Sequence, residues 1–410
     1  MTNIRWAPLI PLIGGFPLGA EAAFERPPEA IYSYDGFASN DSHYVNHQQK
    51  TLGRSNIEYV LLDDRSQAFK QVDVVVGTPP CAALSQLNTG KSVLVRGAEC
   101  AKNDWMYKVF EDGIDLLGAK VVAVENAPAL FTAKGKPVAD KLFEICAKRG
   151  YSLSLYYTST KFHGIPQDRR RCFAIGWKSN TAPIIRNYSR DRLNFDEFVL
   201  NVDNSLKHGD IVINPKITET DGYYRYIKAH SNRDVRDLLR EDRIRTTHNY
   251  VYNKGETNGT TGLIELEKCA VWCEDNGDKR TARRARHAIA KISKGMGIWD
   301  ASIHVAKECI NAVIGRNLVD TIHPNEDRSL TVREALALMG FPDNFEMLNA
   351  SKRINHIAQN VPVCTARDIC LEIKAFLEGK LILSNSTYNM QRNNPDEATT
   401  ELASLEAFLN

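Results

Sequence analysis

Short apolar runs alternate with amphipathic stretches over the first 180 residues of the chain. Two stretches, Asp104–Leu117 and Val138–Arg149, carry apolar residues at helical spacing. This alternation predicts an α/β protein with a doubly wound, mostly parallel, Rossmann-like sheet. The apolar runs that predict its strands are Ala30–Tyr34, Glu58–Leu62, Val72–Val76, Val121–Val124, Tyr151–Thr158 and Cys172–Trp177.

The pattern weakens after Trp177 and returns only near residue 328. Residues 185–327 are richer in Asn, Thr, Arg and Asp, and turn signals such as Asn258-Gly259 interrupt them. We therefore predict two domains. Residues 1–184 and 328–383 form a discontinuous first domain, and residues 185–327 form a smaller second one.

Two helices and a tail complete the predicted organisation. In the stretch Ser329–Gly340, Thr331 is the expected N-cap and Glu334 follows three residues later, as in a capping box. A further helix is predicted at Thr365–Glu378. Residues 384–410 are polar and rich in Asn and Thr, so we expect a tail with little regular structure.

Composition changes this picture in only a few respects. The 410 residues are 43% hydrophobic and carry a net charge of +2, so any nucleic-acid-binding surface must be local. Nine cysteines at irregular spacing favour a reducing compartment, and Cys269 and Cys273 fit one turn of a helix better than a zinc site. We find no membrane-spanning run and no signal peptide, and therefore expect a cytoplasmic protein without a membrane partner.

Glycines and acids follow the first three strands of the predicted sheet. Gly14 and Gly15 come after the apolar segment Ala7–Ile10, where glycine lets the backbone approach a ligand closely. Asp35 and Asp63 end the next two strands, where carboxylates suit sugar hydroxyls and a base. Because we find no lysine motif for binding phosphates, the pattern favours a nucleoside cofactor without phosphates over ATP.

A thiol, a carboxylate and arginines stand at the ends of further strands. The run Val72–Val76 leads through two prolines to Cys81, which the prolines would hold stiffly at the sheet edge. Glu125 ends the run Val121–Val124, and Arg169 and Arg171 precede the strand that begins at Cys172. A cysteine so placed is a candidate nucleophile if its pKa is lowered or its target is activated.

At this point the chain resembles the DNA cytosine-5 methyltransferase family, over roughly residues 8–180 and 320–375. The match rests on ordered blocks rather than on one motif. The blocks are the turn with Gly14, Gly15 and Gly19; Pro79-Pro80-Cys81 with Ser85; Glu125-Asn126; Gln167-x-Arg169-x-Arg171; Arg328–Glu334 with Gly340-Phe341-Pro342; and Asn360-Val361-Pro362.

The resemblance implies a class I methyltransferase fold, S-adenosylmethionine as cofactor and a smaller target-recognition domain. It implies that the Cys81 thiolate attacks C6 of a cytosine flipped out of the duplex, while Glu125 protonates or hydrogen-bonds N3. Arg169 and Arg171 would hold O2 and orient the acid. The residues it assigns to the cofactor are Gly14, Gly15, Asp35, Asp63, Pro80, Gln359 and Asn360, and those it assigns to DNA include Ser85 and Gln167.

The family likeness is less close around the cofactor. Pro8, Ile10 and Leu12 replace an acid, a phenylalanine and a glycine of the first family motif, and Ala358-Gln359 departs from the last one. The reactive positions are intact, so we expect activity. The changed cofactor positions leave open whether the transferred group is methyl.

The predicted second domain contains two basic stretches, Arg225–Arg245 and Lys279–Lys294. The second stretch holds no acid, and the family context favours phosphate contact there over a merely solvated helix face. We assign Arg283, Arg284 and Arg286 to DNA contact. The implied partners are double-stranded DNA and a cognate restriction endonuclease of a prokaryotic or phage restriction-modification system, and we expect a monomer.

Two other functions stay open at this level. A relative that acts on RNA is disfavoured by the large variable domain and by Ser85. A DNA-binding relative without turnover differs from an enzyme in one measurable respect: substitution of Cys81 abolishes methylation only in the enzyme.

Overall fold

The computed structural model describes residues 3–80, 84, 97–257, 261–296, 302–306 and 308–395. The chain divides into two compact units. The sheet unit comprises Met1–Arg192, Leu336–Asn349 and Asn355–Asn410, and the helical unit comprises Leu193–Ala335 and Ala350–Ile354. The domain ends predicted from the sequence, at residues 184 and 327, precede the unit ends Arg192 and Ala335.

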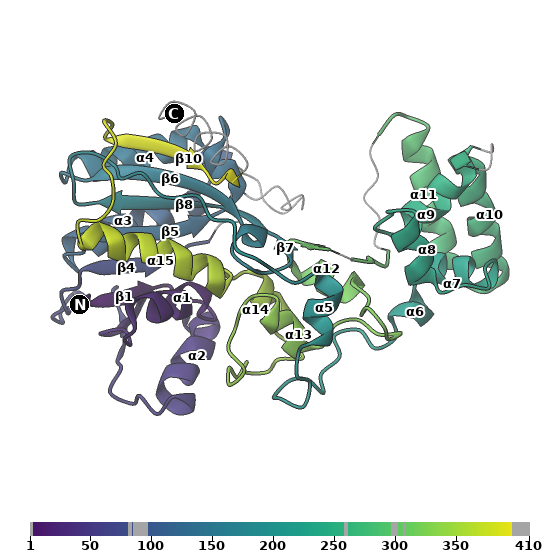
Figure 1. The fold of residues 1–410 in the computed structure, drawn as a ribbon, viewed down its shortest axis with the longest axis horizontal. Helices are drawn as coiled ribbons and strands as arrows, with labels where there is room; N and C mark the ends of the chain where they lie inside the picture. The colour runs from purple at the N-terminus through teal and green to yellow at the C-terminus, as the bar shows by residue number, and fades with distance from the viewer. Residues whose placement is uncertain are drawn as a thin grey trace, which may run out of the picture. The chain divides into compact units, whose positions relative to one another are not determined.

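The sheet unit is built on an eight-stranded sheet of order β10-β6-β8-β5-β4-β1-β2-β3 (Figure 1). All strand pairs are parallel except the two made by β8, which runs antiparallel to β5 and to β6. The strands are β1 Trp6–Leu9, β2 Ile31–Ser33, β3 Tyr59–Leu61, β4 Val74–Gly77, β5 Val121–Asn126, β6 Ser152–Ser159, β8 Arg170–Trp177 and β10 Tyr388–Arg392. The mostly parallel sheet predicted from the sequence is confirmed.

Helices cover both faces of this sheet, which explains why β4 and β5 are apolar at almost every position. Val74 and Val121 lie in one core cluster with residues of α1 and α15, whereas Val75 and Val122 lie in another with residues of α3 and α4. The helices of this part are α1 Gly15–Phe24, α2 Ala38–Asn46, α3 Asp104–Asp115, α4 Lys136–Ala147, α14 Ile354–Ala358 and α15 Val363–Leu377.

The end of the described chain differs from the expected polar tail. Tyr388–Arg392 forms β10, which pairs in parallel with β6 at the edge of the sheet. The side chain of Asn393 then donates to the Thr158 hydroxyl at 3.0 Å. The segment carries few apolar residues because an edge strand keeps a face in solvent, and for that reason its pattern resembles a tail.

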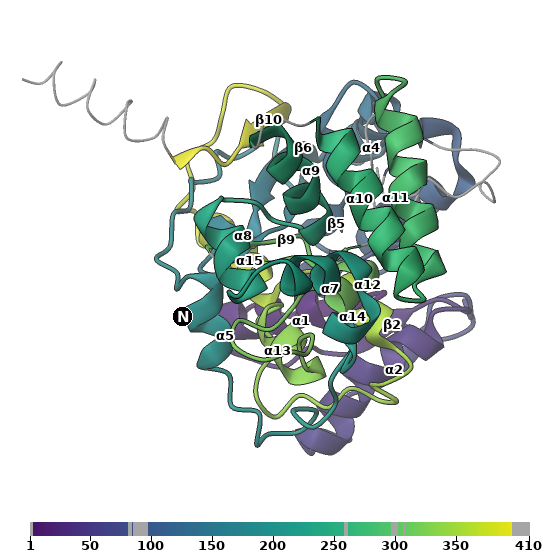
Figure 2. The same ribbon diagram turned by 90° about the vertical axis from the view of Figure 1, so that its right-hand side faces the viewer.

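The helical unit packs a core of its own around Tyr223, Leu239, Leu266 and Ile303. Cys269 and Cys273 lie buried on one helix, as predicted. Figure 2 shows α10 and α11 side by side. The elements are α5 Phe195–Leu200, α6 Ile217–Thr220, α7 Gly222–Ala229, α8 Val235–Glu241, α9 Thr247–Thr257, α10 Gly262–Asp275, α11 Lys279–Ile292 and α12 Gly315–Asp320.

Three further short elements are β7 Gln167–Asp168, β9 Ile310–Asn311 and α13 Val332–Ala337. The predicted capping box begins α13. Glu334 donates its backbone N–H to the Thr331 hydroxyl at 3.1 Å, and its carboxylate accepts the Thr331 N–H at 2.8 Å. Among the described residues, none of the helices has both the length and the apolar character needed to cross a bilayer.

Candidate active site

The carboxyl ends of β4 and β5 bring the predicted reactive segments to one edge of the sheet. β4 and β5 pair in parallel, and β4 leads through Thr78 to the half-buried Pro80. Because β8 runs antiparallel to β5, the beginning of β8 lies beside the end of β5, with Cys172 opposite Asn126. Cys81 and Ser85 lie outside the described residues.

Glu125 and Arg171 form an ion pair at this edge. The Arg171 Nε lies 2.5 Å from Glu125 Oε1, and the two side chains are 15% and 3% exposed. A carboxylate held so far from water keeps a fixed orientation and interacts strongly with any group placed beside it. The nearby Cys172 is no rival nucleophile, since burial, and secondarily the Glu125 charge, raise the pKa of its thiol.

Arg169 is buried and directed away from this pair. Its Nη2 donates to the carbonyls of Ala358 and Asn360 at 2.9 and 2.8 Å. Asn360 in turn accepts the Gly15 backbone N–H on its side-chain oxygen at 2.9 Å. Arg169 therefore positions the segment beside the glycine turn, and its contact with the base stays a prediction.

Gln167, which the resemblance assigns to the DNA, lies in the interior of the sheet unit. Its side chain is fully buried, and its amide nitrogen donates to the Leu338 carbonyl at 2.7 Å. A buried amide that holds a backbone carbonyl stabilises the local fold. Gln359, by contrast, is exposed next to the buried Asn360.

The glycine turn between β1 and α1 packs closely against its surroundings. A Cβ on Gly15 would lie 1.9 Å from the Val361 carbonyl oxygen, so the position admits only glycine. Leu12, where the family has glycine, adopts a left-handed φ of 53°. Its N–H donates to Asp41 Oδ1 at 3.0 Å, which holds the strained turn.

Asp41 was not singled out by the sequence analysis. It is fully buried on α2 and also accepts hydrogen bonds from the hydroxyls of Ser33 and Tyr59. Burial raises the pKa of Asp41 to about 6. Its carboxylate thus joins the glycine turn, β2 and β3, and no apolar pattern marks it in the sequence.

The structure brings the predicted acids Asp35 and Asp63 together at the ends of β2 and β3. The Asp35 backbone N–H donates to Asp63 Oδ2 at 2.7 Å, and Lys108 Nζ lies 3.0 Å from Asp63 Oδ1. Burial raises the pKa of Asp63, but these two partners outweigh it and hold the pKa below its ordinary value. Asp35 is exposed, and a Cβ on the adjacent Gly36 would meet nothing within 4 Å. Exposed carboxylates beside open space fit the hydroxyl and amino groups of an adenosine.

The three arginines assigned to DNA contact lie on α11 in different settings. Arg286 is paired with Glu267 and Glu274 at 3.1 and 2.7 Å, and the Arg284 guanidinium lies 5.7 Å from the centre of the Tyr223 ring. Arg283 is exposed and has no ion pair within the described chain. It shares one helix face with Arg280 and Lys291, which are exposed and half-exposed, and the exposed Lys294 follows just after the helix.

The other basic stretch is largely neutralised by neighbouring acids. Arg225 pairs with Asp278 at 2.6 Å, and Arg236 pairs with Asp234 at 2.6 Å. Arg233 forms an ion pair with Glu241. In the described part of the helical unit, cations of these stretches that form no ion pair with an acid therefore lie on the exposed face of α11 and, in the other stretch, at Arg243 and Arg245.

Comparison with known proteins gives one family. A model of the C-5 cytosine-specific DNA methylases matches residues 5–375. The type II methyltransferase M.Bpa9945I of Bacillus paralicheniformis is 24% identical over 381 residues, covering 87% of this chain and 82% of the relative. M.MJ0563P of Methanocaldococcus jannaschii, assigned to the type II methyltransferases, is 46% identical over 321 residues, covering 74% and 78%.

The fold likeness extends to solved structures. A prophage-encoded protein of E. coli, assigned as a DNA modification methyltransferase, has a TM-score of 0.54 at 16% identity, covering 92% of this chain and 99% of that one. With its sheet topology, this defines a class I methyltransferase fold. The family model spans nearly the whole chain, and the chain belongs to the C-5 cytosine-specific DNA methylase family, as its motifs predicted. It is a DNA (cytosine-5) methyltransferase.

Proposed function

We propose that this enzyme transfers a methyl group from S-adenosylmethionine to C5 of a cytosine flipped out of double-stranded DNA, through a covalent bond between Cys81 and C6. The observation that carries the proposal is the buried Glu125–Arg171 pair at the end of β5. β5 pairs with β4, the strand that leads to Cys81. A base at this edge would meet an acid and a guanidinium held in fixed orientation.

Each of these groups has a role that the chemistry of cytosine demands. C5 is too weak a nucleophile to accept a methyl group until a thiolate adds to C6. Addition to C6 is helped when N3 gains a proton or a strong hydrogen bond, which Glu125 would provide in its protonated form. After the methyl transfer, C5 loses its proton and the thiolate is eliminated from C6, which restores the ring and frees Cys81. Arg171 holds the Glu125 carboxylate and has further N–H groups with which to bind O2. A base inside the duplex is out of reach, so it must be flipped.

The cofactor residues fit S-adenosylmethionine in their chemistry. When bound, this cofactor supplies an electrophilic methyl group. Asp35 and Asp63 would accept from its ribose and adenine, and the Gly14-Gly15 turn would face its amino-acid end beside Pro80. Asn360 holds the turn from behind, and the exposed Gln359 lies next to it.

Phosphate contacts would come from the exposed face of α11. Thr281, Ala282, Ala285 and Ala288 are the buried face of this helix, and the cations Arg280, Arg283 and Lys291 lie on the opposite side, with Lys294 just beyond the helix end. Such a row of cations binds the DNA backbone without reading sequence. Arg284 and Arg286, which are engaged within the protein, contribute less to this surface.

The test is product analysis with a matched pair of cysteine variants. Purified protein is incubated with S-adenosylmethionine and unmodified DNA, and the digested nucleosides are analysed by mass for 5-methyldeoxycytidine. We expect the product with the wild type, its loss in Cys81→Ser, and its retention in the control Cys364→Ser on α15. Product in Cys81→Ser at the wild-type rate would contradict the covalent mechanism. Product on RNA alone would identify the RNA-modifying alternative, and a different mass increment would identify another transferred group.

The biological setting follows from the type II relatives. We propose that a monomer of this enzyme protects prokaryotic or phage DNA against a cognate restriction endonuclease that recognises the same sequence. DNA methylated by the enzyme should then resist an endonuclease encoded beside it. Sedimentation of the purified protein tests the monomer, since a dimer would have twice the mass.

A further inference from the structure

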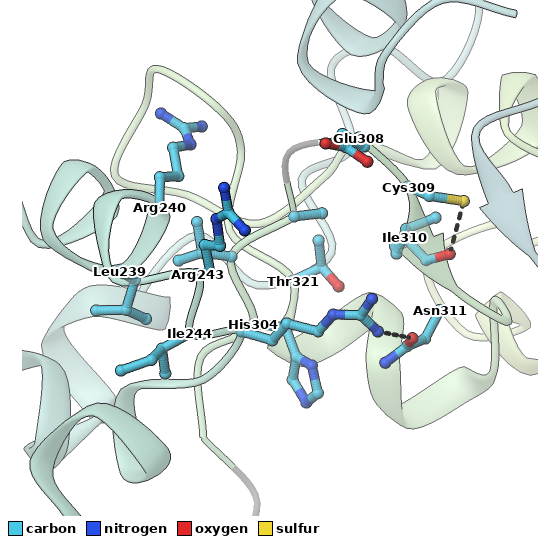
Figure 3. A pocket seen from close by; sticks show the side chains of 13 residues that line it. Leu239, Arg240, Arg243, Ile244, His304, Glu308, Cys309, Ile310, Asn311 and Thr321 are labelled. Atoms are coloured by element: carbon cyan, nitrogen blue, oxygen red, sulfur yellow. Dashed lines mark hydrogen bonds between the residues drawn. The ribbon is translucent and has the colours of Figure 1, made fainter. Parts of the chain in front are cut away.

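The helical unit contains a cavity of about 480 Å³ with walls of mixed character. One part of the wall is apolar and includes Leu239, Ile244 and Val305. The polar groups come from Arg240, Arg243, Arg245, His304, Glu308 and Asn311 (Figure 3). A cavity of this size, with one apolar part of its wall and several convergent polar groups, can admit the edge of a small ring.

The frame of the cavity is held by backbone pairing and by a buried acid. The backbone of His304 forms β-bridges with both Thr246 and Thr321. Val305 donates its N–H to the Arg245 carbonyl at 2.8 Å. Asp221 lies beneath this frame and accepts the Ile303 N–H at 3.0 Å. The backbone of the residues that line the cavity is therefore held in place, as a specific binding site requires.

Arg243 occupies a backbone position that normally belongs to glycine. It follows the end of α8, where Ile244 N–H bonds to the Leu239 carbonyl at 2.8 Å and Arg243 N–H bonds to the Arg240 carbonyl at 3.2 Å. This is a Schellman motif, and Arg243 is its left-handed residue, with φ 55°. An arginine kept at a strained position beside a cavity suggests a function for its side chain.

The three arginines that line the cavity differ in their ion-pair and hydrogen-bond partners. Arg240 is paired with Asp196 at 3.0 Å, and Arg245 donates to Asn311 Oδ1 at 2.9 Å. The guanidinium of Arg243 has no hydrogen bond or ion pair to any described residue. In Figure 3 its side chain extends into the space between Arg240 and Thr321. Its planar set of N–H donors is therefore free to bind a ligand.

We propose that this cavity receives the major-groove edge of a guanine of the recognition sequence, with Arg243 donating to O6 and N7. The inference rests on the proposed function and assigns to it a specificity-determining residue. Arginine pairs with these two acceptors in a bidentate way, which distinguishes guanine from the other bases. The Glu308 carboxylate in the cavity wall disfavours a phosphate.

The experiment combines changes in the protein with changes in single atoms of the DNA. The recognition sequence is first read from the genome of cells that express the wild type. Each guanine of that sequence, apart from the partner of the target cytosine, is then replaced by 7-deazaguanine, which lacks the N7 acceptor. Methylation is measured as kcat/KM for the wild type and for Arg243→Gln, Arg243→Lys and the charge-matched control Lys254→Gln on α9.

We expect one position at which 7-deazaguanine lowers kcat/KM of the wild type and of Lys254→Gln about tenfold. Arg243→Gln should lose about tenfold on normal DNA and show no further loss at that position, while keeping the wild-type response at the others. Arg243→Lys keeps the charge and can still donate to O6 or N7 but loses the planar fork, so it should retain only part of the wild-type response at that position. Arg243→Gly relieves the left-handed strain, so loss of discrimination with an undiminished melting temperature separates this role from a folding defect.

Other results would overturn the assignment. If Arg243→Gln weakens all sequences equally and lowers the salt dependence of DNA binding by one ion, the arginine binds a phosphate. If it keeps the wild-type response to every 7-deazaguanine substitution, the cavity does not read guanine. Failure of the wild type to methylate any DNA would instead refute the proposed function.

Discussion

Asn360 and Gly15 are joined by a buried hydrogen bond of 2.9 Å although 345 positions separate them in the chain. The same side-chain oxygen accepts the Val361 N–H at 2.9 Å, and Arg169 holds the Asn360 carbonyl from the other side. The glycine turn that follows β1 is thus shaped by the segment that precedes α15. Cofactor affinity should depend on residues that do not touch the cofactor themselves.

Asn360→Ala should reveal this dependence. It leaves two backbone N–H groups buried without an acceptor, so we expect a loss of about 1–3 kcal/mol in the free energy of unfolding. The KM for S-adenosylmethionine should rise more than kcat falls, because the turn loses its fixed shape. Urea unfolding and steady-state kinetics measure both effects, with the exposed Asn355→Ala as control. Equal values in the two variants would show that Asn360 has no positioning role.

The sequence was sufficient to predict the sheet and to place Glu125 and Arg171 at the ends of its strands, because acids and arginines at the ends of apolar strands are conspicuous. The sequence was insufficient to show that Arg171 pairs with Glu125 whereas Gln167 and Arg169 are buried. Alternate residues share one side of an extended strand, so the spacing treats all three alike. In the structure Arg169 lies between β7 and β8, and this break sends its side chain into the interior.

The buried face of α11 could not be recognised from the sequence, for a different reason. The buried face of α11 consists of Thr281, Ala282, Ala285 and Ala288, which carry little hydrophobic signal. These small side chains let α11 lie close to α10, and the packing distance rather than the composition defines the face. Asp41 escaped notice because its importance comes from hydrogen bonds to three separate segments, a property without sequence periodicity.

The Glu125–Arg171 pair should behave as one unit in a double-mutant cycle. Arg171→Ala leaves the Glu125 charge buried and unpaired, and we expect it to cost about 3–5 kcal/mol of stability. Glu125→Gln should lower kcat about 10²–10⁴-fold, as removal of a general acid does, with a smaller effect on stability. In the double variant the stability loss should be less than the sum, since no unpaired charge remains. Strict additivity of the two stability losses would contradict a coupled pair.

Stability should fall on mild acidification because of His163. Its Nδ1 lies 2.9 Å from the Asp368 carboxylate and its Nε2 lies 2.8 Å from the Thr158 hydroxyl, and the side chain is fully buried. Burial lowers the pKa of His163, although Asp368 opposes the shift and Arg190 and Arg367 reinforce it. The folded state therefore favours the neutral ring. Its stabilising contribution is complete above the unfolded pKa of about 6.5 and is lost as the pH falls through the lower folded value.

Urea unfolding of the wild type and of His163→Gln between pH 8 and 5 measures this contribution. Below pH 6.5 the wild type should lose up to about 1.4 kcal/mol per pH unit more than the variant, which is the slope for one proton. Asp41, whose pKa is raised to about 6, acts in the opposite direction, because its protonation between about pH 6 and 4 favours the folded state. Parallel pH profiles for the two proteins would show that His163 does not titrate on unfolding.

The last prediction concerns the contribution of the exposed face of α11 to DNA affinity. Arg283→Gln removes an exposed cation without an ion pair in the described chain, whereas Arg286→Gln removes one that Glu267 and Glu274 already neutralise. We expect Arg283→Gln to weaken binding of every DNA sequence and to reduce the salt slope by about one, because one phosphate contact is lost. Arg286→Gln should reduce the slope less, since its guanidinium must leave two carboxylates before it reaches DNA. Anisotropy titrations of labelled DNA at several salt concentrations measure both slopes. A larger effect of Arg286→Gln would mean that DNA binding breaks the ion pairs of α10 and α11 and that the resting surface is not the one that binds.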